Sequence, residues 1–251
     1  MNRSTRFFLA ALLGTAALLA GCASQPPAPL LKAEPKLVNR GTDGNLADGV
    51  RAVLKLSVQR GISDLARPNG FQRFDATRLP MPAVVEPTAR FLRAWGRSRL
   101  VEPLMMDINR GMEIAAGRFL PLLEQRVDDL LIPDVRGLMV SGDTAISDLL
   151  CAPDETRRSE LREAYAPVLK QALVDAGYPV SRGHLVNEYN SIPMLEDIEP
   201  FDVEPELLER GINAICLRIA HQETRIRRFE AERPVDTPDA EAIRHLFAYP
   251  F

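Results

Sequence analysis

Apolar residues recur at helical spacing along most of the chain, and no strand-like alternation persists beyond a few residues. From Leu161 to Leu173 they fall at i, i+4, i+7, i+8, i+11 and i+12, the stripe of a helix with one buried face. The same spacing runs from Leu208 to Ile226, with charged residues mainly on the other faces. The pattern predicts an all-α fold.

Further apolar patterns predict helices over 50–65, 84–95, 100–116, 119–131 and 144–150, and a last helix after Asp236-Thr237-Pro238. Breaks are expected at Asn69-Gly70, at Pro80-Met81-Pro82 and at Gly177-Tyr178-Pro179, where the 161–175 helix should end. No internal repeat of solenoid length is present. Residues 46–251 are therefore expected to form a single domain, an irregular multi-helix bundle.

The first 21 residues have the organisation of an export signal. Arg3 and Arg6 precede an apolar run from Phe7 to Ala20. At about 1.5 Å per residue this run spans roughly 21 Å, short of the bilayer core of about 30 Å. We therefore expect residues 1–21 to be a signal peptide that is removed.

Leu19-Ala20-Gly21-Cys22 resembles the lipobox of bacterial lipoproteins, in which the cysteine thiol accepts a diacylglyceryl group. We expect Cys22 to be lipidated and to attach the protein to a membrane. Residue 23 is Ala and not Asp. By resemblance to lipoproteins of Gram-negative bacteria, this favours the outer membrane, facing the periplasm. The alternative is a soluble secreted protein in which Cys22 is an accidental thiol.

Residues 22–45 contain Pro26, Pro27, Pro29 and Pro35 and no sustained apolar period, which predicts a flexible linker after the lipidated cysteine. Lys and Arg number 31 against 34 Asp and Glu. Without an excess of positive charge, nucleic acid is not an expected partner.

Two further cysteines, Cys151 and Cys216, would enter a compartment that permits disulfides. Cys216 lies in an apolar helical pattern and Cys151 at a helix end, so two separate buried thiols are at least as plausible as a bridge. Neither has histidines at ligand spacing, and no metal or other cofactor is expected. Nor does the chain contain a nucleophile elbow, a phosphate loop or a dinucleotide fingerprint, which weakens any enzymatic hypothesis.

Several short strings, taken in order, resemble an uncharacterised bacterial family of exported all-helical proteins, a domain of unknown function. The strings are Pro68-Asn69-Gly70-Phe71, Leu79-Pro80-Met81-Pro82, Asn109-Arg110-Gly111-Met112-Glu113, Ser141-Gly142-Asp143-Thr144-Ala145, Tyr165-Ala166-Pro167-Val168, Glu223 with Ile226-Arg227, and Thr237 to Phe247. The resemblance implies an all-helical fold and export. It brings no catalytic residue.

Two polar groups are candidates for a site. Asn109, Arg110 and Glu113 are close together on a predicted helix and would bind an anionic or carbohydrate group, or satisfy one another at a helix crossing. Asp143 and Thr144 follow Gly142 in a loop that would cradle a ligand or, through Asp143 or Ser141, cap the next helix. In both cases the structural interpretation is favoured.

Glu223 and Arg227 belong to a mixed-sign run that is expected to be a solvated helix face, with a partner surface as the less favoured alternative. The run continues with Arg225, Arg228, Glu230, Glu232 and Arg233. Its mixed signs argue against an anion-binding strip.

These features favour a non-enzymatic cell-envelope lipoprotein that binds a partner or helps to maintain the envelope. One alternative is a carrier or sensor of a small apolar or lipid-like ligand. Its pocket would be lined by Met105, Met106, Met112, Phe119 and Trp95. An envelope hydrolase is a third, weaker hypothesis.

Overall fold

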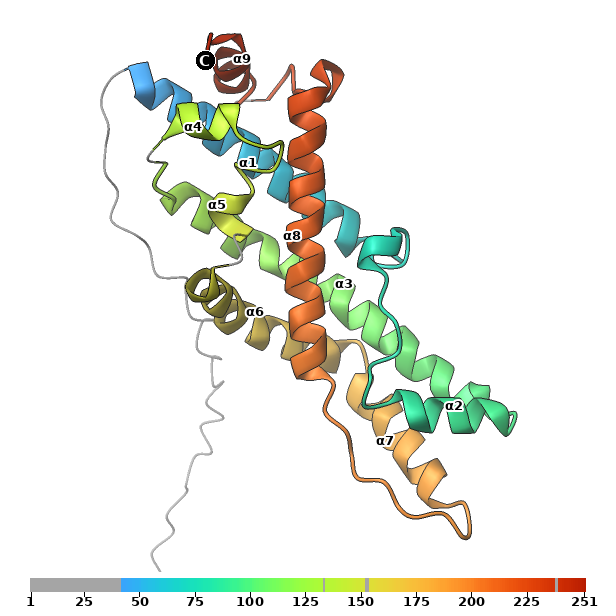
Figure 1. Cartoon of the computed structure of the whole chain (residues 1–251). Helices are drawn as coiled ribbons and strands as arrows, with labels where there is room; N and C mark the ends of the chain where they lie inside the picture. Colours follow the sequence, from blue (N-terminus) through green and yellow to red (C-terminus); the bar gives the residue numbers. More distant parts are fainter. Residues whose placement is uncertain (1–41, 133, 152–153, 238) are drawn as a thin grey trace, which may run out of the picture.

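The computed structural model describes residues 42–132, 134–151, 154–237 and 239–251. Within these ranges the chain forms nine α-helices and two short 3-10 helices, with no strand (Figure 1). The all-α class predicted from the periodicity is confirmed. The predicted signal peptide, Cys22 and most of the predicted linker lie outside the described residues. None of the described helices is both long and apolar enough to cross a bilayer.

The helices follow one another in this order: α1 (Thr42–Ala66), η1 (Asp75–Thr77), α2 (Glu86–Ala94), α3 (Ser98–Asp129), α4 (Val135–Val140), α5 (Asp148–Cys151), α6 (Glu155–Asp175), α7 (Tyr178–Asn190), α8 (Glu204–Arg228), η2 (Glu230–Glu232) and α9 (Ala240–Ala248).

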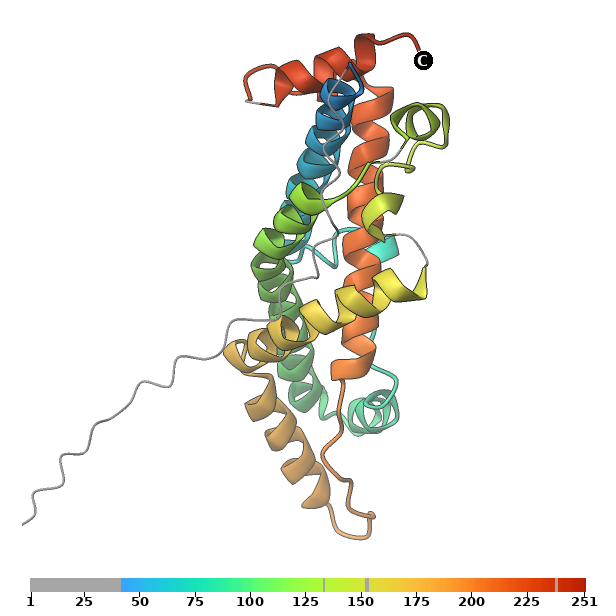
Figure 2. The same ribbon diagram turned by 90° about the vertical axis from the view of Figure 1, so that its left-hand side faces the viewer.

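Three long helices, α1, α3 and α8, form the centre of an elongated body. α1 packs against both α3 and α8, and α6 crosses α3 and α8 (Figures 1 and 2). α9 closes one end by packing on α1, while α2 and α7 pack on α3 at the other end. One buried apolar cluster extends through the body, and in it Phe119 contacts the fully buried Tyr165 with tilted rings, 4.9 Å between ring centroids.

The expected break between 116 and 119 is wrong, because α3 runs unbroken from Ser98 to Asp129. Gly117 costs the helix about 1 kcal/mol relative to alanine. Its neighbours Ala116 and Phe119 are both buried against other helices. Burial of such side chains contributes more than the glycine loses, so tertiary packing keeps the helix continuous.

Sequence analysis also missed α4 and α7. Gly177 has a φ of +93° and ends α6 as expected. The Pro179 that follows it occupies the first turn of α7, where its fixed φ and missing N–H favour helix initiation. The same tripeptide therefore ends one helix and begins the next.

Glycine allows α1 and α8 to approach closely. A Cβ placed on Gly61 would lie 3.0 Å from the carbonyl carbon of Arg218 and 3.0 Å from the backbone nitrogen of Ile219. Both neighbours are backbone atoms of a helix, so they cannot turn aside as a flexible side chain would. The contact between α1 and α8 therefore requires a residue without a side chain at position 61.

We expect Gly61→Ala to lower the free energy of unfolding by about 1–3 kcal/mol through overpacking. Gly183→Ala is the matched control, because nothing lies within 4 Å of the Cβ position at this α7 residue. There the gain in helix propensity should raise stability by up to about 1 kcal/mol. Urea unfolding followed by circular dichroism measures both changes, and equal effects at the two positions would contradict the close-contact account.

Candidate functional site

The first predicted polar group fixes a loop. Glu113 on α3 has a side chain only 5% exposed. Its carboxylate accepts hydrogen bonds from the backbone N–H of Asn69 at 2.6 Å and from Arg110 Nη1 at 3.2 Å. The side-chain oxygen of the neighbouring Asn109 accepts one from Gln72 Nε2 at 2.9 Å. Arg110 and Glu113 pair with each other, and the remaining contacts hold the loop after α1 against α3 in place of the expected helix crossing.

The second predicted group has different contacts. Asp143 accepts a hydrogen bond from Arg228 Nε at 2.6 Å, at the end of α8, and the carbonyl of Thr144 accepts one from the N–H of Asp148 at 3.0 Å. Neither residue has a direct contact with Asn109, Arg110 or Glu113 within the described residues. The candidate cluster is therefore two separate structural groups.

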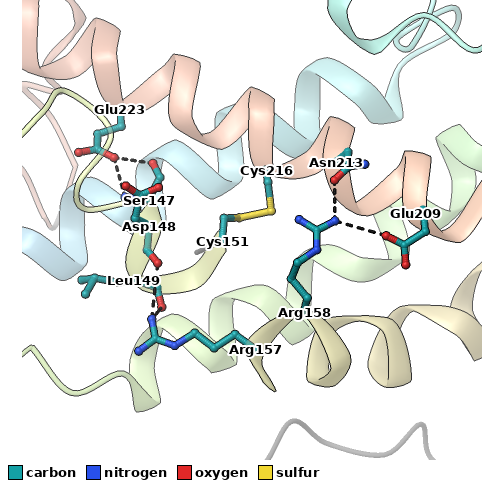
Figure 3. Close-up of a disulfide and its surroundings, with 10 residues drawn as sticks. All are labelled: Ser147, Asp148, Leu149, Cys151, Arg157, Arg158, Glu209, Asn213, Cys216 and Glu223. Carbon is teal, nitrogen blue, oxygen red and sulfur yellow. Dashed lines mark hydrogen bonds and ion pairs between the residues drawn. A yellow bond between two sulfur atoms is a disulfide. The ribbon is translucent and has the colours of Figure 1, made fainter. Parts of the chain in front are cut away.

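A glutamate of α8 takes the role expected of Asp143 or Ser141. Glu223 is fully buried, and its carboxylate accepts a hydrogen bond from the backbone N–H of Ile146 at 3.0 Å. It also accepts hydrogen bonds from the backbone N–H of Ser147 at 2.6 Å and from the Ser147 hydroxyl (Figure 3). The expected caps are wrong, because a carboxylate from a distant part of the chain satisfies these amides. A buried carboxylate needs such donors, since leaving it unpaired costs several kcal/mol.

Arg227 completes this arrangement from one turn along α8. Its Nη1 lies 3.0 Å from Glu223, and its Nη2 donates to the carbonyl oxygens of Leu138 at 3.1 Å and Met139 at 2.8 Å, near the end of α4. The Arg227 side chain is only 8% exposed. The expectation that Glu223 and Arg227 are on a solvated face is thus wrong. The i,i+4 spacing of Glu223 and Arg227 does not show whether the pair is exposed to water or covered by another segment, so the sequence alone could not predict its burial.

We call residues 134–151 the strap, because this segment lies along α8 and is fixed to it at several points. The last fixed point is a disulfide between Cys151, at the end of α5, and Cys216 on α8, with the Cα atoms 5.6 Å apart (Figure 3). From the sequence, two separate thiols are at least as plausible as a disulfide, and in the structure the disulfide is formed. The two cysteines are 65 residues apart, a separation that carries no signal of contact.

A polar groove of about 350 Å³ lies between α1, α8 and η2. The charged and amide side chains that line it include Arg60, Asp64 and Arg67 from α1, Gln222 and Arg225 from α8, and Glu232 from η2.

Two carboxylates organise the groove. Asp64 accepts hydrogen bonds from Arg218, from Gln222 Nε2 at 2.8 Å and from Arg67 Nη2 at 2.7 Å. Glu232 pairs with Arg225 and, at 3.5 Å, with Arg60. Each acid is therefore shared by two guanidinium groups.

The pKa of Asp64 reflects this surrounding. Burial alone would raise it, but the hydrogen bond and charge of Arg218, the hydrogen bond of Gln222 and the charge of Arg67 together lower the pKa below its ordinary value. Asp64 is thereby held ionised at neutral pH, as an acceptor that positions arginines and not as a proton donor.

Of these groove residues, the sequence pattern places only Arg225 and Glu232 in a candidate feature, the mixed-sign run expected to be a solvated face. The signal that would have found them is a pair of polar stripes. Arg60, Asp64 and Arg67 are spaced i, i+4 and i+7 on α1, and Arg218, Gln222 and Arg225 have the same spacing on α8. Each spacing puts its three side chains on one helix face.

The side chains named for a carrier pocket do not gather in one place. Met112 and Phe119 are buried in the core, whereas Trp95 is 59% exposed and Met106 is 69% exposed. Exposed and core side chains are therefore mixed in this set.

We expect Glu223→Gln to lower the free energy of unfolding by about 3–5 kcal/mol, because it leaves Arg227 buried without its ionic partner. The control is Glu230→Gln on the exposed η2, where the change should be within about 0.5 kcal/mol. Both values come from urea unfolding of the oxidised protein. A Glu223→Gln variant as stable as the control would show that the carboxylate is solvated.

Comparison with known proteins identifies the family. No curated protein and no solved structure matches this chain. The model of a family described as "Protein of unknown function (DUF4197)" matches residues 41–237, which is most of the chain. This confirms the resemblance to a family of unknown function, and the chain belongs to the DUF4197 family.

Proposed function

We propose that this protein is a cell-envelope lipoprotein that acts by binding and not by catalysis. The observation that carries the proposal is the disulfide between Cys151 and Cys216. Disulfides persist in oxidising compartments outside the cytosol and are rare inside it. An internal bridge in the folded body therefore supports the export expected from residues 1–21.

The lipid anchor is the second part of the proposal. The lipobox-like Leu19-Ala20-Gly21-Cys22 would make Cys22 the first residue of the mature chain and the site of acylation. The predicted Pro-rich linker would separate this anchor from the helical body, which begins with α1 at Thr42. Ala23 after the cysteine favours the outer membrane, with the body in the periplasm.

The groove supports a binding role over a catalytic one. A general acid or base must exchange a proton during the reaction, and its pKa is usually tuned toward the working pH. The Asp64 pKa is shifted the opposite way, and Glu232 is shared between two arginines. Carboxylates held in this manner fix the geometry of the cations around them.

The anchor is tested by substitution of the acceptor thiol. Cys22→Ser should abolish labelling with radioactive palmitate and move the protein from the detergent phase to the aqueous phase, because several acyl chains are needed for stable anchoring. Ser24→Ala is the control near the same cleavage site and should keep both label and partition. Ala23→Asp should keep the label but shift the protein to the inner-membrane fraction.

Absence of palmitate label on the wild-type protein, or detergent partition of Cys22→Ser, would overturn the lipoprotein proposal. Wild-type protein recovered in the inner-membrane fraction would overturn the assignment to the outer membrane, and labelled Ala23→Asp that remains in the outer-membrane fraction would contradict the sorting role of residue 23.

A further inference from the structure

The groove between α1 and α8 holds more positive than negative charge. Four guanidinium groups, from Arg60, Arg67, Arg218 and Arg225, meet only two carboxylates, those of Asp64 and Glu232. Two positive charges are left over. Glu124 of α3 accepts a 2.6 Å hydrogen bond from Gln59, which also lines the groove. If Glu124 is counted as a third carboxylate, one positive charge remains.

This local excess contrasts with the whole chain, which has a formal net charge of −3. On a protein with net negative charge, a local positive site attracts an anion to that site, whereas the rest of the surface does not.

The arginines are positioned and still accessible. The side chains of Arg60, Arg67 and Arg225 are 33%, 45% and 41% exposed, although each is held by a carboxylate. A guanidinium group has five N–H donors in a planar fork, and a carboxylate partner occupies only some of them. Donors fixed in place before the ligand arrives lose less conformational entropy on binding.

The positive charges of Arg218 and Arg225 also affect the pKa of His221, a neighbour on α8. The pKa of His221 is lowered, first by burial and then by the positive charges of Arg218 and Arg225, while Asp64 acts weakly in the opposite direction. His221 is therefore neutral at pH 7 and adds no charge of its own to the groove.

Helix geometry separates this group from the strap. On α8, Cys216, Glu223 and Arg227 are spaced i, i+7 and i+11 on the face that the strap covers, whereas Arg218, Gln222 and Arg225 are on the opposite face. The groove can thus take a ligand without displacing the strap.

We propose that the groove binds a phosphate group, free or carried on a larger molecule, through the guanidinium groups of Arg60, Arg67 and Arg225. The phosphate anion is opposite in sign to the net positive charge of the groove, and its oxygens match the arginine fork. The volume of about 350 Å³ is at the small end of ligand pockets, so it accommodates the phosphate and a short part of its carrier. The assignment does not depend on lipidation of Cys22.

The test is isothermal titration calorimetry of the oxidised mature chain, prepared without acyl groups so that lipid anchoring does not bind vesicles by itself, with inorganic phosphate at low ionic strength. We expect saturable binding to one site, weakened by added salt. Arg225→Gln and Arg60→Gln should each weaken binding about tenfold or more, because each removes a charge-assisted hydrogen bond. Arg225→Lys keeps the charge but loses the fork, and we expect it to bind more weakly than the wild type.

Arg228→Gln is the matched control. Arg228 follows closely on the same helix, but it pairs with Asp143 outside the groove and its side chain is 62% exposed. This variant should bind phosphate as the wild type does. Circular dichroism and urea unfolding of each variant verify that the fold is retained. Glu232 keeps Arg60 as a partner when Arg225 is replaced.

Sedimentation with phosphatidylcholine vesicles that contain phosphatidic acid distinguishes the two sources of the phosphate. Binding to these vesicles that Arg225→Gln abolishes would assign a lipid headgroup. Phosphate binding without vesicle binding would assign a soluble phosphate compound. The proposal is overturned if the wild type binds neither probe saturably, if Arg225→Gln and Arg60→Gln bind like the wild type, or if Arg228→Gln is weakened as much as they are.

Discussion

Attachment of the strap to α8 is the constraint on which the rest of the structure depends. The disulfide fixes its end covalently, and Glu223 and Arg227 fix its middle with hydrogen bonds to backbone groups. Neither charge is tolerable in a buried position without these partners, so strap and helix need each other. Because the strap occupies one face of α8, the opposite face is left for α1 and for the groove. The strap and the polar groove therefore lie on opposite faces of α8.

Features that depend on residues close together in the chain can be predicted from the sequence, whereas features that depend on distant segments cannot. The all-α class and the amphipathic character of α6 and α8 are properties of nearby residues, and periodicity predicts them. The burial of Glu223 and Arg227 is decided by a segment about eighty residues away in the chain, as the hydrogen bond from Ile146 shows. The same holds for the bridge from Cys151 to Cys216. Two glycines show where local patterns mislead. A break is expected near Gly117, but α3 continues through it, and a helix end is expected at Gly177, but α7 begins directly after it.

The candidate site shows the same limit. Asn109, Arg110, Glu113, Asp143 and Thr144 were selected because polar residues stand close together in sequence, and the structure uses Glu113 and Asp143 to hold loops. The groove residues were not selected, because the two stripes on α1 and α8 have a meaning only when the helices face each other. That meeting depends on Gly61, at the close contact between the two helices. The mixed-sign run on α8 therefore has two faces. Glu223 and Arg227 form a buried pair against the strap, whereas Arg225 is partly exposed in the groove.

We propose that this helical body folds in an oxidising compartment, and the redox state of Cys151 and Cys216 tests that proposal most directly. Cells are quenched in acid, free thiols are alkylated, and the digested native protein is analysed by mass spectrometry without reduction. The account predicts one peptide pair joined through Cys151 and Cys216, with neither cysteine alkylated. Recovery of both cysteines as alkylated free thiols from the native protein would contradict it.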